Sequence, residues 1–374
     1  MKIVFVLENY VPHIGGVEIL FKHLCERLAK KHKVIVVTHR LPNTKQKEVI
    51  NRVEIVRINV PLFWSRYFFT FLSIPKLLSI CKDANIIHTT TYNGAPPAKW
   101  IAMLYKKPSV ITIHEVIGRN WSELLEMNWL SGKLHEFLEW LVVSLKFDRY
   151  VSDSNSTKND FEKVTGKRSQ VIYPGIDYDF WDPKKYDGIK IRKKLGLEKK
   201  YIYLFFGRPG PSKGFEYLLG AVSKIKDTIK DSMLVAILSK DKAYSDRYIK
   251  IKKSISRYGI DNNIKILQPL PRNELPNYIK AADCIVVPSL TEGFGFSVGE
   301  SCAMGKHVVA SDTTSIPEVI SGNYVLVKPK DSDEIAKGVI DVFNLKCTKT
   351  KLKKFSWDDC VNKYEKLYEE MLNG

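Results

Sequence analysis

The stretch AADCIVVPSLTEGFGFSVGES, Ala281–Ser301, contains the pattern from which the fold class follows. Its short apolar run CIVV predicts a buried β-strand, and the polar, glycine-containing loop after it leads into a helical pattern that starts near Phe296. A buried strand followed by a loop and a helix is the building unit of open α/β sheets. In such sheets ligands bind outside the carboxyl ends of the strands.

The same unit recurs along the chain. The first half contains the runs KIVFVLE, KVIVVTH, NIIHTTT and SVITIHE, and the second half contains YIYLFFG, MLVAILS, NIKILQPL, DCIVVPS and HVVASD. Short apolar runs separated by helix-length segments are typical of parallel sheets covered on both faces. Two such series predict an α/β chain with two doubly wound, Rossmann-like domains, as the length of 374 residues also suggests.

Turn and aromatic residues interrupt the alternation in VIYPGIDYDFWDP, Val171–Pro183. We therefore place one domain at residues 1–178 and a second at residues 179–355. The final segment, FSWDDCVNKYEKLYEEML, is predicted to form a helix with Ser356 as its N-cap.

Composition limits the possible partners and compartment. The chain has 59 Lys and Arg against 41 Asp and Glu, a net charge of +18, which favours nucleic acid, acidic lipid headgroups or phosphorylated small molecules. Its 6 cysteines form no CxxC pair and no Cys/His cluster, so neither a zinc site nor a disulfide framework is indicated. The apolar run at the start is too short for a signal peptide, and no run approaches the ~18 residues of a membrane span. We expect a cytoplasmic protein.

Two strand ends in the second half offer groups that suit a phosphorylated ligand. The loop GRPGPSKG after YIYLFF carries Arg208 and Lys213, whose guanidinium fork and point charge fit a diphosphate. It is not a P-loop, because no Ser or Thr follows a Gly-Lys at the required spacing. The loop after DCIVVPS presents backbone amides at a helix N-terminus, which favours phosphate oxygens. These amides belong to Gly293, Phe294, Gly295 and Phe296.

Two carboxylates accompany that second loop. Glu292 can accept hydrogen bonds from ligand hydroxyls, and Glu300, about one turn into the helix, can bind a vicinal diol such as a ribose. The alternative for Glu300 is a solvated helix residue.

The first half contains a glycine pair and two strand-end histidines. Gly15 and Gly16 in GGVE let backbone approach a ligand closely at a helix N-terminus, or simply allow tight packing. His114 ends SVITIHE and is a candidate for bonding a sugar hydroxyl or phosphate. For His88, at the end of NIIHTTT, a hydrogen-bonded core position is the favoured interpretation.

Taken together, these motifs resemble the retaining GT-B glycosyltransferases of the family 4 type (glycosyl transferases group 1). The resemblance runs nearly end to end. It is carried by GGVE, VITIHE, VSDSNSTKNDF, VIYPGID, GRPGPSKGFEYLL, AADCIVVPSLTEGFGFSVGES and FSWDDCVNKYEKLYEEM.

The resemblance implies a nucleotide-diphosphate sugar donor bound in a cleft that the two domains face. Arg208 and Lys213 would neutralise the diphosphate, with help from the amides around Phe294–Phe296 and from Gly15 and Gly16. Glu300 would bind the ribose, while Glu292 and His114 would orient the sugar. No metal and no cofactor is implied.

The resemblance also implies that the helix of about 356–374 crosses back onto the first domain, which would bind the acceptor, a glycan or a lipid-linked sugar. One departure stands out. The family usually has Gly-Gly before I-P-E, whereas Thr314 and Ser315 stand here.

Two segments of the first domain are unusually aromatic. PLFWSRYFFTFLSIPKLL, Pro61–Leu78, combines aromatic with basic residues, as does the stretch from Trp121 to Lys146. Such mixtures suit helices that lie on an anionic membrane surface. For the first segment we expect contact with a lipid or a lipid-linked acceptor, hence peripheral contact with the inner membrane face. For the second, an ordinary buried helix face is about equally expected.

Three other functions stay open at this point. A GT-B-like nucleotide-sugar epimerase would share the two-domain shape but use no acceptor. A Rossmann oxidoreductase is weakly suggested by Gly293, Gly295 and Gly299, although the acidic residue Asp312 lies nearer than the ~20 positions of a dinucleotide fingerprint. The net charge suggests a nucleic-acid-binding protein, but the sequence has no RRM, zinc-finger or helix-turn-helix signature, so we expect no nucleic-acid partner.

Overall fold

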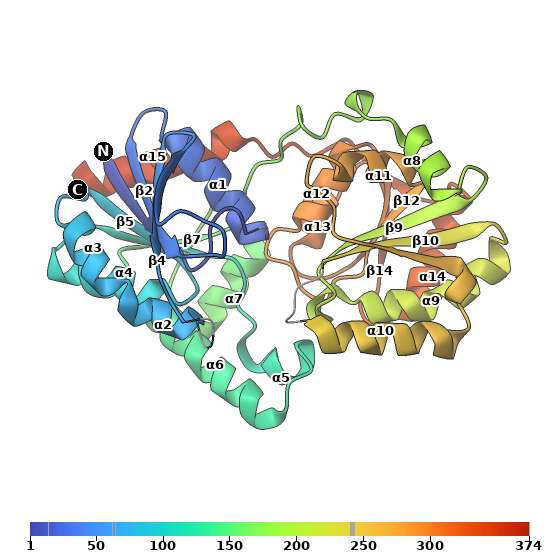
Figure 1. Ribbon diagram of the computed structural model, residues 1–374, viewed down its shortest axis with the longest axis horizontal. Helices are drawn as coiled ribbons and strands as arrows, with labels where there is room; N and C mark the ends of the chain where they lie inside the picture. Colours follow the sequence, from blue (N-terminus) through green and yellow to red (C-terminus); the bar gives the residue numbers. More distant parts are fainter. Residues whose placement is uncertain (14, 62, 64, 240–243, 374) are drawn as a thin grey trace. The chain divides into compact units, whose positions relative to one another are not determined.

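The computed structural model describes residues 1–374 except 14, 62, 64, 240–243 and 374. The chain divides into two compact units, each with its own sheet and core (Figure 1). Unit 1 comprises Met1–Ser122, Asn128–Gly175 and Phe355–Gly374, and unit 2 comprises Glu123–Met127 and Ile176–Lys354. The chain passes from unit 1 to unit 2 within the segment Val171–Pro183, where the alternation of strands and helices is interrupted.

The described part of unit 1 is built on an 8-stranded sheet in the order β3-β4-β2-β1-β5-β6-β7-β8. All of its pairings are parallel except β3 with β4. The strands are β1 (Lys2–Val6), β2 (Lys33–His39), β3 (Lys47–Ile50), β4 (Val53–Ile58), β5 (Ile86–Thr90), β6 (Ser109–Ile113), β7 (Arg149–Ser152) and β8 (Gln170–Val171). The helices are α1 (Gly16–Leu28), α2 (Ser65–Leu72), α3 (Ile74–Cys81), α4 (Ala95–Leu104), α6 (Trp129–Ser144), α7 (Asn155–Thr165) and α15 (Trp357–Asn373), while α5 (Trp121–Leu124) contributes residues to both units.

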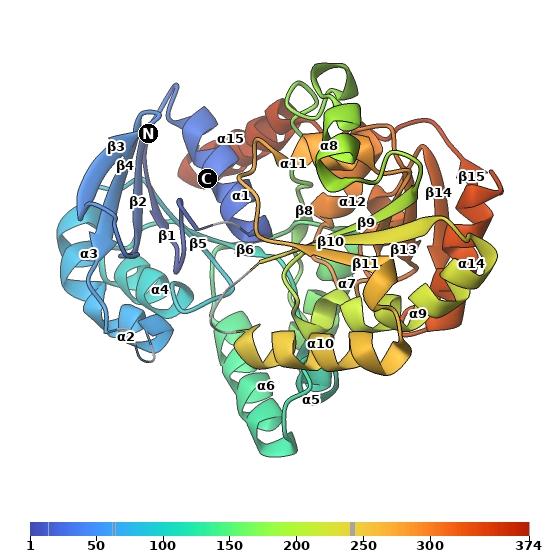
Figure 2. The same ribbon diagram turned by 45° about the vertical axis from the view of Figure 1, so that its right-hand side comes forward.

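Unit 2 has a 7-stranded sheet in its described part, in the order β11-β10-β9-β12-β13-β14-β15, parallel except for the last pair. The strands are β9 (Tyr201–Gly207), β10 (Ser232–Leu238), β11 (Ile264–Leu267), β12 (Cys284–Val287), β13 (His307–Ser311), β14 (Asn323–Val327) and β15 (Thr348–Lys349). The helices are α8 (Gly188–Leu195), α9 (Phe215–Thr228), α10 (Ser245–Tyr258), α11 (Leu275–Ala281), α12 (Phe296–Ala303), α13 (Ile316–Val319) and α14 (Ser332–Phe343). Figure 2 shows α9 and α10 on one face of this sheet and α11 and α12 on the other.

The central strands are buried on both faces, as their uninterrupted apolar runs predict. In β1, every residue from Ile3 to Val6 is fully buried, and in β12, Cys284 and Ile285 are fully buried. Parallel strands covered by helices on both sides have no solvent face, so they show no polar alternation. The prediction of two doubly wound α/β domains is therefore confirmed.

The last helix, α15, belongs to unit 1 and packs against α1. The Ser356 hydroxyl accepts hydrogen bonds from the amides of Asp358 and Asp359, at 3.1 and 3.3 Å, so it caps the helix as predicted. Tyr364 and Tyr368 on this helix are fully buried. The carboxyl-terminal segment is thus part of the core of unit 1.

Candidate active site

In unit 2, the loops after β9 and β12 are joined by backbone and side-chain bonds. The Leu290 amide donates to the Ser212 carbonyl at 2.7 Å. Gly214 has φ +62°, and a Cβ there would lie 2.0 Å from the Pro288 carbonyl oxygen. Only glycine permits this close approach, which brings the Arg208–Lys213 loop against the loop that carries Glu292.

Lys213 and Glu292, predicted independently from two motifs, form an ion pair. Lys213 Nζ donates to Glu292 Oε1 at 2.6 Å, and Ser289 Oγ donates to the same oxygen at 2.7 Å. The Glu292 side chain is only 10% exposed, so the pair is largely shielded from solvent. Arg208, at the end of β9, is exposed. The strand ends therefore hold two cations and one fixed carboxylate.

The loop that follows Glu292 enters α12 as the sequence indicates. Gly295 is the N-cap, Phe294 is buried, and its ring meets that of Phe296 edge-on at 5.1 Å. The first amides of a helix have no intrahelical partners, and the helix dipole places positive potential there. This end of α12 therefore favours an anion.

Glu300 is 4% exposed, so the interpretation as a solvated residue is wrong. The structure pairs it with Arg272, whose Nη2 donates to Glu300 Oε1 at 2.8 Å. The Arg272 guanidinium lies 5.4 Å from the ring of Trp181 and 5.7 Å from that of Phe180. Burial raises the pKa of Glu300, while the charge and hydrogen bond of Arg272 oppose that rise.

The remaining predicted residues belong to unit 1. Gly15 caps α1 in an extended conformation, and a Cβ there would lie 2.4 Å from Glu18 Oε2. A carboxylate thus already occupies the space beside Gly15, which disfavours a second anion at that point. Gly16 is the first residue of α1.

His114 is buried at the end of β6 and lies beside a carboxylate that ends the neighbouring strand. Its Nδ1 is 3.0 Å from Asp153 Oδ2, a spacing that suits donation of the Nδ1 proton to the carboxylate. Among the described residues, no group bonds the buried Nε2 of His114. Nε2 is therefore available to a ligand. Burial raises the pKa of Asp153, and the hydrogen bond from His114 opposes that rise.

Sequence reasoning did not assign Asp153, Arg272 or Ser289. Asp153 follows β7 within VSDSNSTKNDF, so its position at a strand end was a usable signal. Arg272 and Ser289 had no such signal, because their roles come from partners that only the fold brings near.

His88 is a core residue, as favoured from the sequence. It is fully buried, with Nδ1 2.6 Å from the Tyr368 hydroxyl and Nε2 2.8 Å from Thr112 Oγ1. Burial, and secondarily the nearby His114, lowers the pKa of His88 from 6.5 to about 3.

This lowered pKa predicts acid sensitivity of unit 1. Because the pKa of His88 is lower in the folded than in the unfolded protein, the stability that the neutral ring contributes is complete above pH 6.5. It is lost progressively as the pH falls from 6.5 to about 3. We expect His88→Gln to lower the urea unfolding free energy at pH 7 and to narrow its difference from the parent at pH 4. The pH-dependent part is on the order of a few kcal/mol. A parent-to-variant difference that stays constant between pH 7 and pH 4 would contradict this assignment.

Within the described residues, no group of three or more His, Cys, Asp or Glu side chains is arranged to hold a metal ion. Asp177-Tyr178-Asp179 has the D-x-D pattern found in some metal sites, but Asp179 pairs with Lys185 at 2.5 Å and Asp177 Oδ1 accepts from the Phe180 amide.

Two family models match this chain, one over each half. The family model described as "Glycosyltransferase Family 4" matches residues 14–180, and that described as "Glycosyl transferases group 1" matches residues 187–356. The chain therefore belongs to the group 1 glycosyltransferases, which have the GT-B fold.

Individual relatives and structures show the same likeness. An uncharacterized glycosyltransferase of Methanocaldococcus jannaschii is 27% identical over 99% of this chain and 98% of its own length. A D-inositol 3-phosphate glycosyltransferase of Corynebacterium jeikeium is 23% identical over 96% of this chain and 92% of its own. The structure of Anabaena HepE in complex with UDP and glucose matches with a TM-score of 0.80 and 18% identity, covering 99% of this chain and 100% of that one.

Proposed function

We propose that this glycosyltransferase moves a sugar from a nucleotide-diphosphate donor to a glycan or a lipid-linked acceptor, with retention of the anomeric configuration. The observation that carries the proposal is the Lys213–Glu292 pair, which joins two strand-end loops beside Arg208 and the N-terminus of α12. Anabaena HepE, which has the same fold, has been solved in complex with UDP-glucose, which supports a donor of this class.

In this mechanism, negative charge develops on the diphosphate as its bond to the anomeric carbon breaks. Arg208, Lys213 and the amides of Gly293, Phe294, Gly295 and Phe296 are assigned to that charge, because fixed cations and dipoles stabilise it without reorganising. The acceptor oxygen bonds to the anomeric carbon on the face that the diphosphate leaves. Its proton passes to a departing phosphate oxygen.

The other predicted residues are assigned to the sugar and the nucleoside. Glu292 accepts hydrogen bonds from sugar hydroxyls, while the His114–Asp153 pair offers Nε2 to another hydroxyl. Glu300, with Arg272 on one oxygen, has lone pairs left for a ribose diol. Gly15 and Gly16 are assigned to backbone contacts with the uncharged sugar or nucleoside of the donor, because the Glu18 carboxylate beside Gly15 disfavours the diphosphate at that point.

The test is a product assay with UDP-glucose, GDP-mannose and ADP-glucose, each with and without a lipid-linked acceptor extract. Transfer requires the acceptor, and NMR of the product should show the donor's anomeric configuration. Isomerised sugar formed from the donor alone would instead support the epimerase alternative, which the family membership does not favour.

We also propose that transfer takes place at an anionic membrane surface, and α6 is the main support. Its large side chains that point to solvent are Trp129, Leu130, Leu134, Phe137, Trp140 and Leu141, each more than 40% exposed. The buried residues of this helix are Gly132 and Val143. The expectation that this segment could be an ordinary buried face is therefore wrong.

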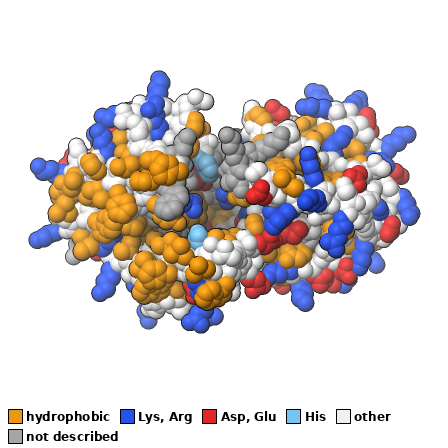
Figure 3. Space-filling view, turned by 60° about the horizontal axis from the view of Figure 1, so that its bottom comes forward, with side chains coloured by type: hydrophobic (Ala, Val, Ile, Leu, Met, Phe, Trp, Pro, Cys, Tyr) orange, Lys and Arg blue, Asp and Glu red, His pale blue; other side chains and the backbone are white. Residues whose placement is uncertain are grey.

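A second set of exposed apolar side chains lies on and near α2 and α4. It consists of Phe63, Tyr67, Phe71, Leu72, Trp100, Met103 and Leu104. Figure 3 shows hydrophobic side chains gathered over this side of unit 1. Leu62 and Trp64 of the predicted aromatic segment lie outside the described residues. Exposed apolar patches of this extent mark interaction sites.

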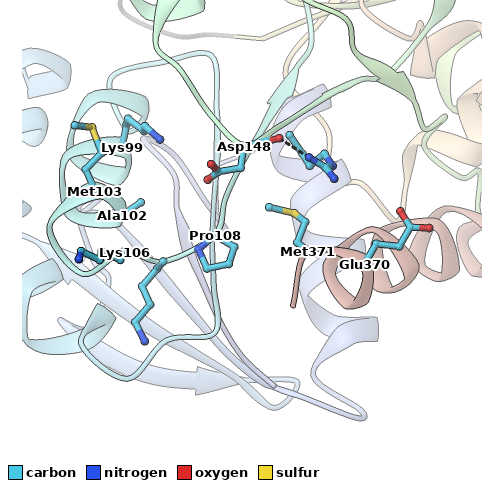
Figure 4. Close-up of a pocket in the computed structure, with 10 residues that line it drawn as sticks. Lys99, Ala102, Met103, Lys106, Pro108, Asp148, Glu370 and Met371 are labelled. Atoms are coloured by element: carbon cyan, nitrogen blue, oxygen red, sulfur yellow. Dashed lines mark hydrogen bonds between the residues drawn. The ribbon is translucent and has the colours of Figure 1, made fainter. Parts of the chain in front are cut away.

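A basic hollow of about 480 Å³ borders the α4 side chains (Figure 4). Four cationic residues line it, with Asp148 and Glu370 as the acidic ones and Met103 and Met371 among the apolar ones. The cationic residues are Lys99, Lys106, Lys107 and Arg149. Cations beside exposed aromatic side chains suit anionic lipid headgroups. None of the described helices is long and apolar enough to cross a bilayer.

Serine substitutions on α6 test the membrane contact. We expect Leu134→Ser/Phe137→Ser/Trp140→Ser to lower flotation with phosphatidylcholine–phosphatidylglycerol vesicles at least about tenfold, because each side chain loses burial in the interface. Phe69, an obvious target in α2, is fully buried and would test folding instead. Ile189→Ser/Ile249→Ser/Leu345→Ser, at three exposed positions of unit 2, is the matched control. Unchanged flotation of the folded α6 variant would remove the proposal.

A further inference from the structure

The turn after β13 places three consecutive hydroxyl side chains against the loop that carries Glu292. Thr313 Oγ1 donates to the Leu290 carbonyl at 3.3 Å, and Ser315 Oγ donates to the Glu292 carbonyl at 2.9 Å. Between them, the Glu292 amide donates to Thr314 Oγ1 at 3.0 Å. We refer to Thr313, Thr314 and Ser315 as the hydroxyl triad. It bonds both backbone groups of Glu292.

Thr314 adopts its position at a conformational cost. Its φ is +44°, in the left-handed region that β-branched residues rarely enter. Such strain persists only where the surroundings fix it, and it concentrates at functional sites. Glycine would adopt this φ without strain but has no hydroxyl. The triad therefore keeps a strained threonine where its oxygen accepts from Glu292.

The carboxylate of Glu292 is held by two hydrogen bonds, as its backbone is. Oε1 accepts from Lys213 and Ser289, and Lys213 comes from the neighbouring loop. With its backbone bonded on one side and its side chain on the other, Glu292 has little freedom to rotate. The amides of Gly293 and the next residues continue directly from this anchored point.

We propose that the hydroxyl triad is a positioning device, which holds Glu292 and the amides after it in the geometry that the donor sugar and diphosphate require. Its catalytic consequence rests on the proposed function. The hydrogen-bonded geometry itself does not, and it can be tested without any ligand.

Hydrogen exchange of the unliganded protein tests the geometry. Thr314→Val keeps the side-chain shape but removes the acceptor, so we expect the Glu292 amide to exchange about fivefold faster or more, as loss of one hydrogen bond implies. Thr314→Ser keeps the hydroxyl and should keep the slow exchange. Equal exchange rates in the parent and Thr314→Val would overturn the proposal, whatever reaction the enzyme catalyses.

The double variant Thr314→Gly/Ser315→Gly tests the consequence. Relief of strain offsets lost hydrogen bonds, so the unfolding midpoint should stay near that of the parent. Release of nucleotide diphosphate from UDP-glucose, GDP-mannose or ADP-glucose should fall about tenfold, with kcat changing more than KM. Thr314→Ser, which keeps the hydroxyl, should keep the kcat of the parent.

Ser223→Ala, which removes a side-chain bond to the Tyr258 carbonyl elsewhere in unit 2, is the control. A double glycine variant with the kcat of the parent, or one whose loss of kcat only follows its unfolding midpoint, would overturn the positioning role, as would an equal loss of kcat in Thr314→Ser. A parent that is inactive with all three sugars would count against the proposed function, and the exchange rates would then decide the inference alone.

Discussion

Arg208→Ala/Lys213→Ala should lower kcat/KM for the nucleotide sugar by at least about a thousandfold. Each side chain is assigned to the charge that develops on the departing diphosphate, and loss of one such donor typically costs 10²–10³-fold. The loss should appear mainly in kcat, because the charge is greatest in the transition state. Steady-state release of nucleotide diphosphate measures it.

Arg208 and Lys213 differ in their contribution to stability, so each substitution needs its own control. Arg208 is exposed, so Arg208→Ala should leave the unfolding midpoint unchanged. Lys213→Ala leaves the nearly buried Glu292 without its cation, so the unfolding midpoint is measured beside turnover, and the midpoint of Lys213→Ala/Glu292→Gln shows how much lost stability comes from the unpaired carboxylate. Lys253→Ala/Arg257→Ala removes the same charge from exposed positions on α10 and should turn over like the parent. A double alanine variant that is folded and as fast as the parent would refute the assignment.

Asp153→Asn should lower turnover about 10- to 100-fold, by analogy with the loss of carboxylates that orient metal-binding histidines. The carboxylate fixes the proton of His114 on Nδ1 and leaves Nε2 to accept a sugar hydroxyl. An amide in its place can donate to Nδ1 and so select the other tautomer.

The stability of Asp153→Asn should not fall with its turnover. Burial raises the pKa of Asp153, so its ionised form is costly in the folded protein at neutral pH. Asp153→Asn removes that charge and should leave the unfolding free energy unchanged or higher. His114→Ala should lose at least as much activity as Asp153→Asn. Parent-like turnover in Asp153→Asn would show that the pair serves only packing.

The fold was predictable because parallel strands that are covered on both faces have unbroken apolar runs in their sequence. Strand β1 is one example, and β12, followed by its loop and α12, is another. Strand β4 was missed because VEIVRI contains Glu54 and Arg57, and Arg57 is nonetheless fully buried. Its charge is accommodated by Glu48 and two backbone carbonyls, which no local pattern reveals.

Site residues at strand ends were predictable from the sequence, whereas their partners from other loops were not. Position at a strand end singled out Arg208, Lys213 and Glu292, because the carboxyl ends of parallel strands gather at one edge of the sheet. The partner of Glu300 could not be anticipated, since Arg272 comes from another loop. Exposure of α6 was equally hidden, because an apolar helix stripe has the same sequence whether it faces a core or solvent.

The central claim is that unit 2 binds the diphosphate of a nucleotide sugar through its strand-end cations and loop amides. A thermal-shift titration of the parent and of Arg208→Ala/Lys213→Ala with UDP-, GDP- and ADP-sugars tests it most directly. One nucleotide class should raise the unfolding midpoint of the parent, and the variant should lose most of this rise. A flat response of the parent to all three classes, or equal rises in parent and variant, would contradict it.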